Sequence, residues 1–332
     1  MTSYVLRRLG FGAILIFLAT IVSFAILKLS PGEAGAAEID PRLSQEYIDQ
    51  QKRIFGLDQP AWRQYLNWLG VLKLSSRDAH GGLLQGDLGV SISYKQPVSS
   101  VIAPRLVATL LLNLVTIAFT WAVAIPLGTY AAVHQYKWPD RVLSGISFTG
   151  MSAPNFFLAL LVLWIFAAKV HWLPPGGLRG LDHDRMSLAG KAGDYARHLI
   201  LPVVVLTFGA LAGLQRITRG NMLETLRLQY ITTARAKGLA ENRVIYKHAL
   251  RNAVNPLITL LGFEFAALFG GAALLENVIN FPGMGQLMLE ALRAKDQFVV
   301  MAVFLIGAIM LVIGNLLAEL LLAWVDPRVS YE

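Results

Sequence analysis

Six long runs of apolar residues are separated by polar segments along the chain. They cover residues 9–29, 106–133, 142–168, 198–218, 256–275 and 298–323. Each is long enough for a helix to cross a hydrocarbon core about 30 Å thick. Because the backbone finds no water there, each run is expected to be helical. The pattern predicts an all-α integral membrane protein with six transmembrane helices. Pro126, Gly270 and Gly271 are positions where a span would kink or break and change that count.

The composition agrees with this pattern and excludes several other classes of protein. Of the 332 residues, 55% are hydrophobic and 15% are charged, against about 25% charged residues in a soluble domain. A disordered tail, a collagen-like fibre and a highly solvated binding module are therefore excluded. The sequence contains no cysteine, so disulfides, thiolate metal sites and cysteine nucleophiles are excluded too.

The first run differs from a cleaved signal peptide. Arg7 and Arg8 precede it, but it is longer than the apolar part of most signal peptides, and no small-x-small cleavage site follows directly. We therefore interpret residues 1–29 as a first transmembrane helix that is retained in the protein, with its N-terminus in the cytoplasm.

The net charge of +8 is concentrated in one loop. Residues 211–256, between the fourth and fifth runs, hold an excess of six positive charges, from eight basic residues and two acidic ones. Residues 30–105 hold eight of each sign. Because basic loops stay on the cytoplasmic side, this distribution predicts that both termini and the loop after the fourth run are cytoplasmic. Residues 30–105, here called the external segment, then lie outside.

The remaining organisation follows from this topology. Residues 106–325 form a core of five spans, and residues 326–332 form a cytoplasmic tail. Within the external segment, Pro41 and Gly56 delimit one expected helix, and residues 60–72 a second. The second helix places Trp62, Tyr65, Leu66 and Leu69 on one side. It is expected either to lie along the outer membrane surface or to pack against the outer ends of the spans.

No arrangement of residues typical of catalysis is visible. The chain lacks a G-x-x-x-x-G-K-[ST] phosphate loop and a nucleophile elbow. His183 lies between Asp182 and Asp184, which we interpret as a solvated polar loop and not as a metal site. We expect no catalytic residue, cofactor or metal in this chain. Within the spans, Glu264 and Glu319 are the main ionisable residues, expected either to line a pathway or to form helix–helix hydrogen bonds.

Residues 221–255, here called the 221–255 loop, have the most distinctive pattern. Helical spacing over residues 225–236 is interrupted at Gly238 and resumes over residues 241–253. Asn255 and Pro256 then open the fifth run. A helix–glycine–helix element that protrudes from the bilayer would dock in a groove of a partner and transmit its movement to two spans. Binding of a basic surface helix to anionic lipid is the other interpretation.

Parts of this loop resemble a known family. They are the run Y-I-T-T-A-R-A-K-G-L at residues 230–239, H-A-L-R-N-A at residues 248–253, and Pro256. These residues resemble the cytoplasmic EAA loop of binding-protein-dependent ABC importers, in the B-type permease of the oligopeptide, dipeptide and nickel systems. Residues that match the general EAA pattern are Gly238, Ala234 and Leu250, and residues that differ are Thr232, Thr233, His248 and Arg251. The resemblance extends to residues 57–60, 64–69, 86–89, 97–98 and 105–110, to Glu276 with residues 281–285, and to residues 326–328. It is weakest over residues 169–197.

The resemblance implies a type I ABC importer permease fold of six spans, with an external helical insertion between the first and second. It implies a second homologous permease, two ATPase subunits that bind Mg-ATP, an external solute-binding protein and a bacterial inner membrane, with no nucleic acid. Peptides are the expected substrates, while nickel chelates, glutathione and oligosaccharides remain open. The residues implied to contact the ATPase are Thr233, Ala234, Arg235, Ala236, Lys237, Gly238, Leu239, His248, Leu250 and Arg251.

Two other functional classes remain as alternatives. A secondary transporter or channel would need Glu264 or Glu319 to titrate or bind an ion. A membrane-embedded enzyme would need a nucleophile, base or metal arrangement that the sequence does not display. Separately, Gly209 and Gly213 offer a small-residue face, either for a second permease subunit or for packing within this one.

Overall fold

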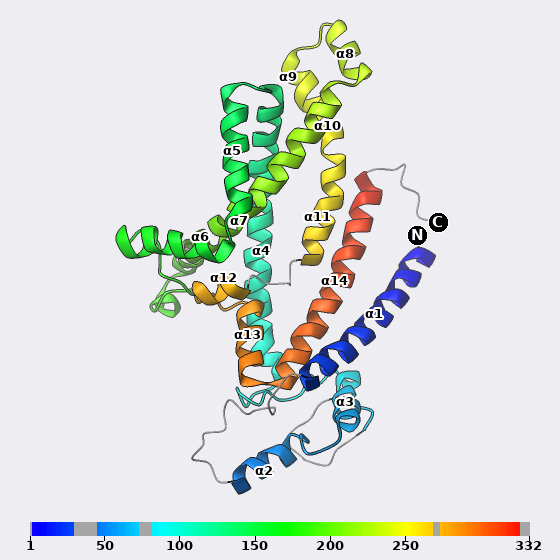
Figure 1. The fold of residues 1–332 in the computed structure, drawn as a ribbon, viewed down its shortest axis with the longest axis vertical. Helices are drawn as coiled ribbons and strands as arrows, with labels where there is room; N and C mark the ends of the chain where they lie inside the picture. The colour runs from blue at the N-terminus through cyan, green and yellow to red at the C-terminus, as the bar shows by residue number, and fades with distance from the viewer. Residues whose placement is uncertain (1, 30–44, 73–81, 268–272, 326–332) are drawn as a thin grey trace.

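A computed structural model describes residues 2–29, 45–72, 82–267 and 273–325. Within these residues the structure is helical, with no named strand, and it is elongated (Figure 1). Four helices are long and apolar enough to cross a membrane: Leu6–Leu29, Val98–Val133, Leu188–Leu226 and Gln297–Leu317. A bent helix pair would add a fifth. The count of six spans stays a prediction, because residues 268–272 of the fifth run lie outside the described residues.

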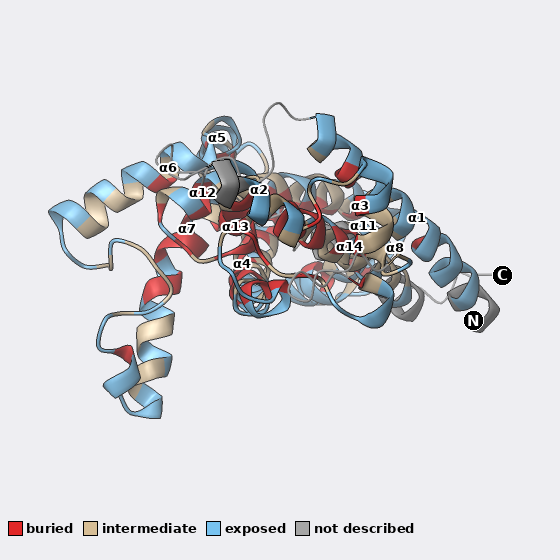
Figure 2. Ribbon diagram, turned by 90° about the horizontal axis from the view of Figure 1, so that it is seen from below, coloured by how far each residue is buried: buried red, intermediate tan, exposed pale blue. Residues whose placement is uncertain are grey.

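The long helices pack as two groups. Helix α4 (Val98–Val133) packs along α7 (Leu188–Leu226), and α5 (Trp138–Ser152) packs on α7 as well. Helix α14 (Gln297–Val325) contacts both α11 (Asn255–Ala267) and α1 (Thr2–Leu29). Much of α1 is exposed, including Phe11 and Phe17, whereas buried residues are frequent on α4, α7 and α13 (Figure 2). The outer face of α1 is therefore available to lipid or to another subunit.

Glycines allow the close approach of helices around α7. A Cβ on Gly128 of α4 would lie 2.7 Å from the Gln215 carbonyl oxygen and 2.7 Å from Thr218 Cβ. A Cβ on Gly209 would lie 2.9 Å from Asn155 Oδ1, while around Gly213 there is open space within 4 Å. The two glycines of the small-residue face predicted on α7 therefore differ. Gly209 packs against another part of this chain, whereas Gly213 has free space beside it.

The third apolar run is not one straight helix. Helix α5 ends at Ser152, and the chain continues as α6 (Asn155–Val162) and a π-helical segment, η3 (Leu163–Lys169), at 104° to α5. The cause is Pro154, because proline excludes the helical conformation at the preceding residue, and Ala153 is extended, with φ −90° and ψ 127°. The prediction of a continuous helix over residues 142–168 is wrong at this point.

The fifth run is described only in part. Helix α11 ends at Ala267, residues 268–272 lie outside the described residues, and α12 (Ala273–Val278) follows. Next comes α13 (Met284–Ala294), whose N-terminus is held by two side chains. The buried Glu276 carboxylate accepts a hydrogen bond from the Gln286 backbone N–H at 2.7 Å, and Thr109 Oγ1 of α4 accepts one from Met284 N–H at 2.8 Å. The Thr109 bond attaches α13 to α4, and the Glu276 bond attaches it to α12.

The external segment contains two described helices, α2 (Gln45–Ile54) and α3 (Ala61–Leu69). The predicted start near Pro41 lies outside the described residues. The predicted apolar side of α3 is partly wrong, because Trp62 is exposed while Trp68 and Gln64 are buried. Tyr65 lies against α1, with its hydroxyl 2.8 Å from Thr20 Oγ1 and its ring centroid 5.3 Å from that of Phe24. Packing against a span therefore accounts for the position of α3.

A short loop of the external segment, residues 86–97, precedes α4 and is tied to the start of α14. The 3-10 turn η2 (Leu83–Gln85) leads into this loop. The fully buried Asp296 accepts hydrogen bonds from the Ser91 hydroxyl at 2.5 Å, from Ser93 N–H at 3.0 Å and from Val299 N–H at 3.2 Å. The Asp296 carboxylate thus binds the loop and also accepts a backbone hydrogen bond at the N-terminus of α14.

We expect Gly128→Val to destabilise the fold by about 1 to 3 kcal/mol, because the added side chain forces α4 away from α7. The apparent melting temperature of the detergent-solubilised protein measures this effect. Gly145→Val is the matched control, since a Cβ on Gly145 meets no atom within 4 Å. Equal melting temperatures of the two variants would contradict the close approach as a constraint.

Candidate functional site

The 221–255 loop continues directly from a long membrane helix. Helix α7 extends past the apolar run to Leu226, and α8 (Gln229–Ala236) follows after a turn at Leu228. Gly238 has φ +74°, a conformation that glycine adopts without steric cost. The chain then forms α9 (Glu241–Arg243), the π-helical η5 (Val244–Ala249) and α10 (Leu250–Ala253), which leads into α11. The loop therefore has a helix on each side of Gly238, at one end of the molecule (Figure 1).

An apolar cluster gives the loop a core of its own. Ile231, Val244 and Ala249 are fully buried, and they pack with Met222 of α7. Polar contacts close the outside of the loop. The Tyr230 hydroxyl accepts a hydrogen bond from Asn252 Nδ2 at 2.6 Å, and Arg235 Nη2 lies 2.7 Å from Glu241 Oε1 across the glycine turn. The hydrogen bond from Arg235 holds the pKa of Glu241 below its usual range.

The ten residues predicted to contact an ATPase do not share one surface. Those that are exposed are Thr233, Arg235, Ala236, Lys237, Gly238 and Arg251. Half-buried residues are Leu239, His248 and Leu250, and Ala234 is buried. The helical repeat explains the division, because Ala234 lies three residues after Ile231 on the inner face of α8. Ala234, Leu239 and Leu250 are therefore part of the internal packing of the loop.

A buried ion pair that sequence reasoning missed lies below this loop. Arg219 of α7 donates to both carboxylate oxygens of Asp140 in α5, from Nε at 2.5 Å and from Nη2 at 2.8 Å. The Tyr136 backbone N–H donates to the same carboxylate at 2.9 Å. Asp140 is only 3% exposed. The Arg219 hydrogen bonds hold the pKa of Asp140 below its usual range, and the pair joins the α4–α5 turn to α7.

Both intramembrane carboxylates have partners on another helix. Trp121 Nε1 of α4 donates to Glu264 Oε2 of α11 at 2.8 Å. Arg8 Nε of α1 donates to Glu319 Oε2 of α14 at 2.9 Å. Of the two expected roles, these contacts correspond to helix–helix hydrogen bonding. The second contact also places the start of α1 next to the end of α14.

The interpretation of His183 as part of a solvated loop is wrong. Asp182 and Asp184 are exposed, but His183 is 4% exposed, and its Nδ1 lies 2.7 Å from Asp194 Oδ2. Asp194 also accepts a hydrogen bond from the Gly180 N–H at 2.9 Å, and its other oxygen lies 3.2 Å from His198 Nδ1. The local D-H-D pattern could not reveal a partner eleven residues away.

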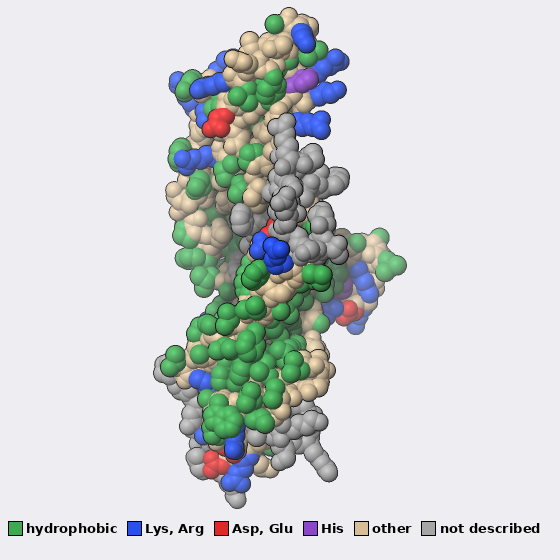
Figure 3. Space-filling model, turned by 90° about the vertical axis from the view of Figure 1, so that its right-hand side faces the viewer, with side chains coloured by type: hydrophobic (Ala, Val, Ile, Leu, Met, Phe, Trp, Pro, Cys, Tyr) green, Lys and Arg blue, Asp and Glu red, His purple; other side chains and the backbone are tan. Residues whose placement is uncertain are grey.

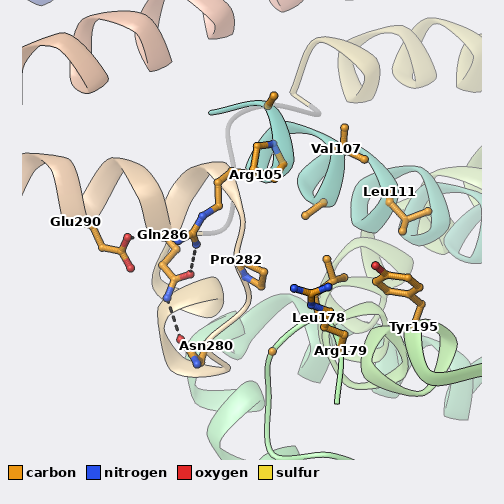
Figure 4. A pocket seen from close by; sticks show the side chains of 14 residues that line it. Arg105, Val107, Leu111, Leu178, Arg179, Tyr195, Asn280, Pro282, Gln286 and Glu290 are labelled. Atoms are coloured by element: carbon orange, nitrogen blue, oxygen red, sulfur yellow. Dashed lines mark hydrogen bonds and ion pairs between the residues drawn. The ribbon is translucent and has the colours of Figure 1, made fainter. Parts of the chain in front are cut away.

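A cavity of about 1120 Å³ lies among three segments that are far apart in the sequence. We call it the Arg105 cavity. Its walls come from the start of α4, from residues 177–179 with Tyr195 of α7, and from residues 280–290 around α13. Arg105 Nη1 donates to Gln286 Oε1 at 2.9 Å, and its Nη2 lies 3.8 Å from Glu290 Oε2 (Figure 4). Sequence reasoning did not find this cavity, because its walls come together only when distant segments pack.

Comparison with known proteins identifies the family. A family model described as the binding-protein-dependent transport system inner membrane component matches residues 124–331. A second model, for the N-terminal part of membrane components of such systems, matches residues 1–113. The chain belongs to this family of transporter membrane components.

Relatives of this permease are similar along their whole length. The oligopeptide transport system permease protein AppB of Bacillus subtilis is 39% identical over 332 residues, which cover 100% of both chains. The dipeptide transport system permease protein DppB of Escherichia coli K12 is 34% identical over 355 residues, again covering 100% of both. The glutathione transport system permease protein GsiC of Escherichia coli O6:H1 is 31% identical over 332 residues. The predicted kinship with peptide-type ABC permeases is confirmed.

A solved structure shares the fold of the permease. A chain of the inward-facing MetNI methionine ABC transporter has a TM-score of 0.55 and 19% sequence identity, with 68% of this chain and 96% of that chain covered. At this identity the likeness concerns the fold alone. It agrees with the predicted type I importer fold, while the count of six spans and the external insertion stay predictions.

We expect Asp140→Asn to destabilise the permease by about 1 to 3 kcal/mol, because Arg219 loses a charged acceptor. The pKa of Asp140 is lower in the folded than in the unfolded protein, so its contribution is present above about pH 4 and is lost as the pH falls through the folded-state pKa. The difference in melting temperature from wild type should therefore shrink below about pH 4. Asp182→Asn, at an exposed position, should show no difference at any pH. A difference for Asp140→Asn that is independent of pH would contradict the role of its charge.

We expect Glu264→Gln to keep transport within about twofold of wild type, because the glutamine oxygen still accepts the Trp121 hydrogen bond. Glu264→Leu removes that acceptor and should lower the melting temperature. Uptake by the reconstituted complex and thermal unfolding measure the two effects. A loss of uptake in a stably folded Glu264→Gln variant would instead indicate a titrating carboxylate, as in a secondary transporter.

Proposed function

We propose that this chain is the transmembrane permease subunit of an ATP-driven importer for peptides, worked by separate ATPase subunits that dock on the 221–255 loop. One observation carries this proposal: the loop is a packed unit attached to two membrane helices, with an exposed glycine turn at its tip. Lys and Arg side chains gather at this end of the molecule, while hydrophobic side chains cover much of the middle (Figure 3). The family of the chain is one of membrane permease subunits.

The packing of the loop supports a role in transmitting movement. Because Ile231 and Val244 share one apolar core with Met222 of α7, the loop and the end of α7 would move as a unit. At the other end of the loop, α10 leads into α11. Asn221 Nδ2 of α7 donates a hydrogen bond to the Ala253 carbonyl at the end of α10, at 3.2 Å. Helix α7 packs on α4, and α11 packs on α14. A displacement of the loop would therefore reach both groups of membrane helices.

The exposed residues of the loop are suited to close contact. Thr233, Ala236 and Gly238 have short side chains or none, which lets a partner approach the backbone. Lys237 and Arg251 add positive charge that would pair with acidic residues of an ATPase. The other predicted docking residues act differently in this proposal. Arg235 braces the turn through Glu241, and Ala234, Leu239, His248 and Leu250 preserve the shape of the docking surface.

The remaining partners follow from the same proposal. Mg-ATP binds to the two ATPase subunits and not to this chain. A second, homologous permease covers one apolar face, lipid covers the others, and a solute-binding protein delivers substrate at the outer side of the inner membrane. Both termini then lie on the cytoplasmic side, in agreement with the contact between Arg8 and Glu319 near the two chain ends. The names of the relatives, which specify oligopeptide, dipeptide and glutathione transport, support peptides as the cargo.

We expect Gly238→Asp to leave the permease inserted and assembled but to lower substrate-stimulated ATP hydrolysis and uptake by about tenfold. The added side chain blocks close approach and repels acidic residues of the ATPase. Gly193→Asp is the matched control, because Gly193 also lies in open space but at the opposite end of α7. Both activities are measured in the complete complex in liposomes. Unchanged hydrolysis and uptake in Gly238→Asp would contradict docking at this turn.

A further inference from the structure

The Arg105 cavity has no role in the proposed coupling, yet its construction is that of a binding site. Its volume of about 1120 Å³ is slightly larger than the range of roughly 300 to 1,000 Å³ for small-molecule sites. Residues 103–111 lie across the start of the second apolar run, whereas residues 177–179 with Tyr195 lie between the third and fourth runs and residues 280–290 between the fifth and sixth. The predicted topology of six spans places all three segments toward the external side. A solute released at that side would meet this cavity first.

Charged side chains lie on both walls: the Glu290 carboxylate, beside Arg105, is on one wall, and the Arg179 guanidinium is on the other. Glu290 and Arg105 extend from one side of the cavity, and Arg179 and Tyr195 from the other (Figure 4). The Glu290 carboxylate accepts a hydrogen bond from the Tyr94 hydroxyl at 2.7 Å. Burial of Tyr94 and this hydrogen bond raise the pKa of Tyr94 to about 12, so the tyrosine remains a donor. Arg179 is about half exposed, with its Nη1 3.2 Å from Asp184, which is more exposed still.

Both walls are held by buried contacts. Arg179 immediately precedes Gly180, whose N–H donates to Asp194, and Tyr195 immediately follows Asp194. The buried His183–Asp194 contact at 2.7 Å therefore places Arg179 and Tyr195 on the same wall. On the other side, the hydrogen bond from Gln286 N–H to Glu276 sets the start of α13, which carries Glu290. The two charges are thus presented by a preformed frame.

The surface between the charged walls is apolar. Val107, Leu111, Leu178 and Pro282 contribute to it. Such a surface accepts side chains of different shapes without demanding particular hydrogen bonds. A purely anionic ligand would meet repulsion from Glu290, and a purely cationic one repulsion from the arginines. A ligand with an ammonium group at one end, a carboxylate at the other and variable apolar groups between them satisfies all three features.

We propose that the Arg105 cavity binds short peptides with free ends, the α-ammonium at Glu290 and the α-carboxylate at Arg179, before they enter the pathway. This assignment rests on the proposed function, because it takes the cargo to be peptide and the cavity to open on the external side. Arg105 is a positioning residue, which orients Glu290 and Gln286. Tyr195 adds a hydroxyl to the carboxylate end.

The lack of cysteine allows a direct test. Ala103 is exposed and lines the cavity, so Ala103→Cys introduces a single thiol into this subunit at the site. The rate of maleimide labelling is measured in the assembled transport complex in nanodiscs, without the solute-binding protein. The probes are trialanine, N-acetyl-trialanine and trialanine amide. Leu181→Cys, fully exposed and outside the cavity, is the control for labelling.

We expect trialanine to slow the labelling of Ala103→Cys, and each blocked peptide to need roughly tenfold higher concentration for the same protection. Adding Glu290→Gln should weaken protection by trialanine by a similar factor without changing protection by N-acetyl-trialanine. Adding Arg179→Gln should leave protection by trialanine amide unchanged. Arg185→Gln, a matched change on the same loop but outside the cavity, should alter nothing.

Three results would overturn the assignment: no protection by millimolar trialanine, equal protection by free and blocked peptides, or equal protection of Leu181→Cys. Uptake of peptide by the complete system, with ATP and the solute-binding protein, is measured in parallel. Uptake without selective protection refutes the cavity assignment alone. Selective protection without ATP-driven uptake refutes the proposed function and leaves the binding site in place.

Discussion

The close packing of α4 on α7 is the contact on which the rest of this permease depends. It is possible only because Gly128 has no side chain where the Gln215 carbonyl and Thr218 lie. Protein interiors tolerate little added volume, so a helix pair in such contact behaves as one body. The Asp140–Arg219 pair extends the contact to α5. The resulting three-helix unit carries the 221–255 loop at one end and two walls of the Arg105 cavity at the other.

This arrangement connects the two proposed sites through a single element. Helix α7 contains Tyr195 at the cavity and Met222 beneath the loop, and it is an unbroken helix between them despite Pro202. A movement of the loop would therefore reach the Arg179–Tyr195 wall without passing through a flexible joint. The opposite wall belongs to α13, which is attached to α4 through Thr109 and precedes α14.

Local patterns in the sequence predicted the membrane class, the helices on both sides of Gly238 and the relationship to peptide-type permeases. They failed where the outcome depended on the conformational limits of one residue or on distant partners. The bend at Pro154 was missed because apolar residues continue across it. The set of docking residues stays a prediction, and the linear motif did not separate Ala234, which faces the core of the loop, from the exposed Lys237. His183 was placed in solvent because its neighbours in sequence are charged, whereas its partner, Asp194, lies on the next helix.

Run length, hydropathy and the positions of basic residues are local quantities, and they suffice to specify that this chain enters a membrane and which loop is basic. The pairings Asp140–Arg219 and Trp121–Glu264, the cavity and its two charged walls are not local quantities. Each joins residues separated by dozens of positions. A polar residue in an apolar run has the same neighbours in sequence whichever helix it contacts, so the sequence pattern does not identify its partner. Which contacts form is decided when the helices pack, because burying a charge without a partner costs far more than any preference within a single helix.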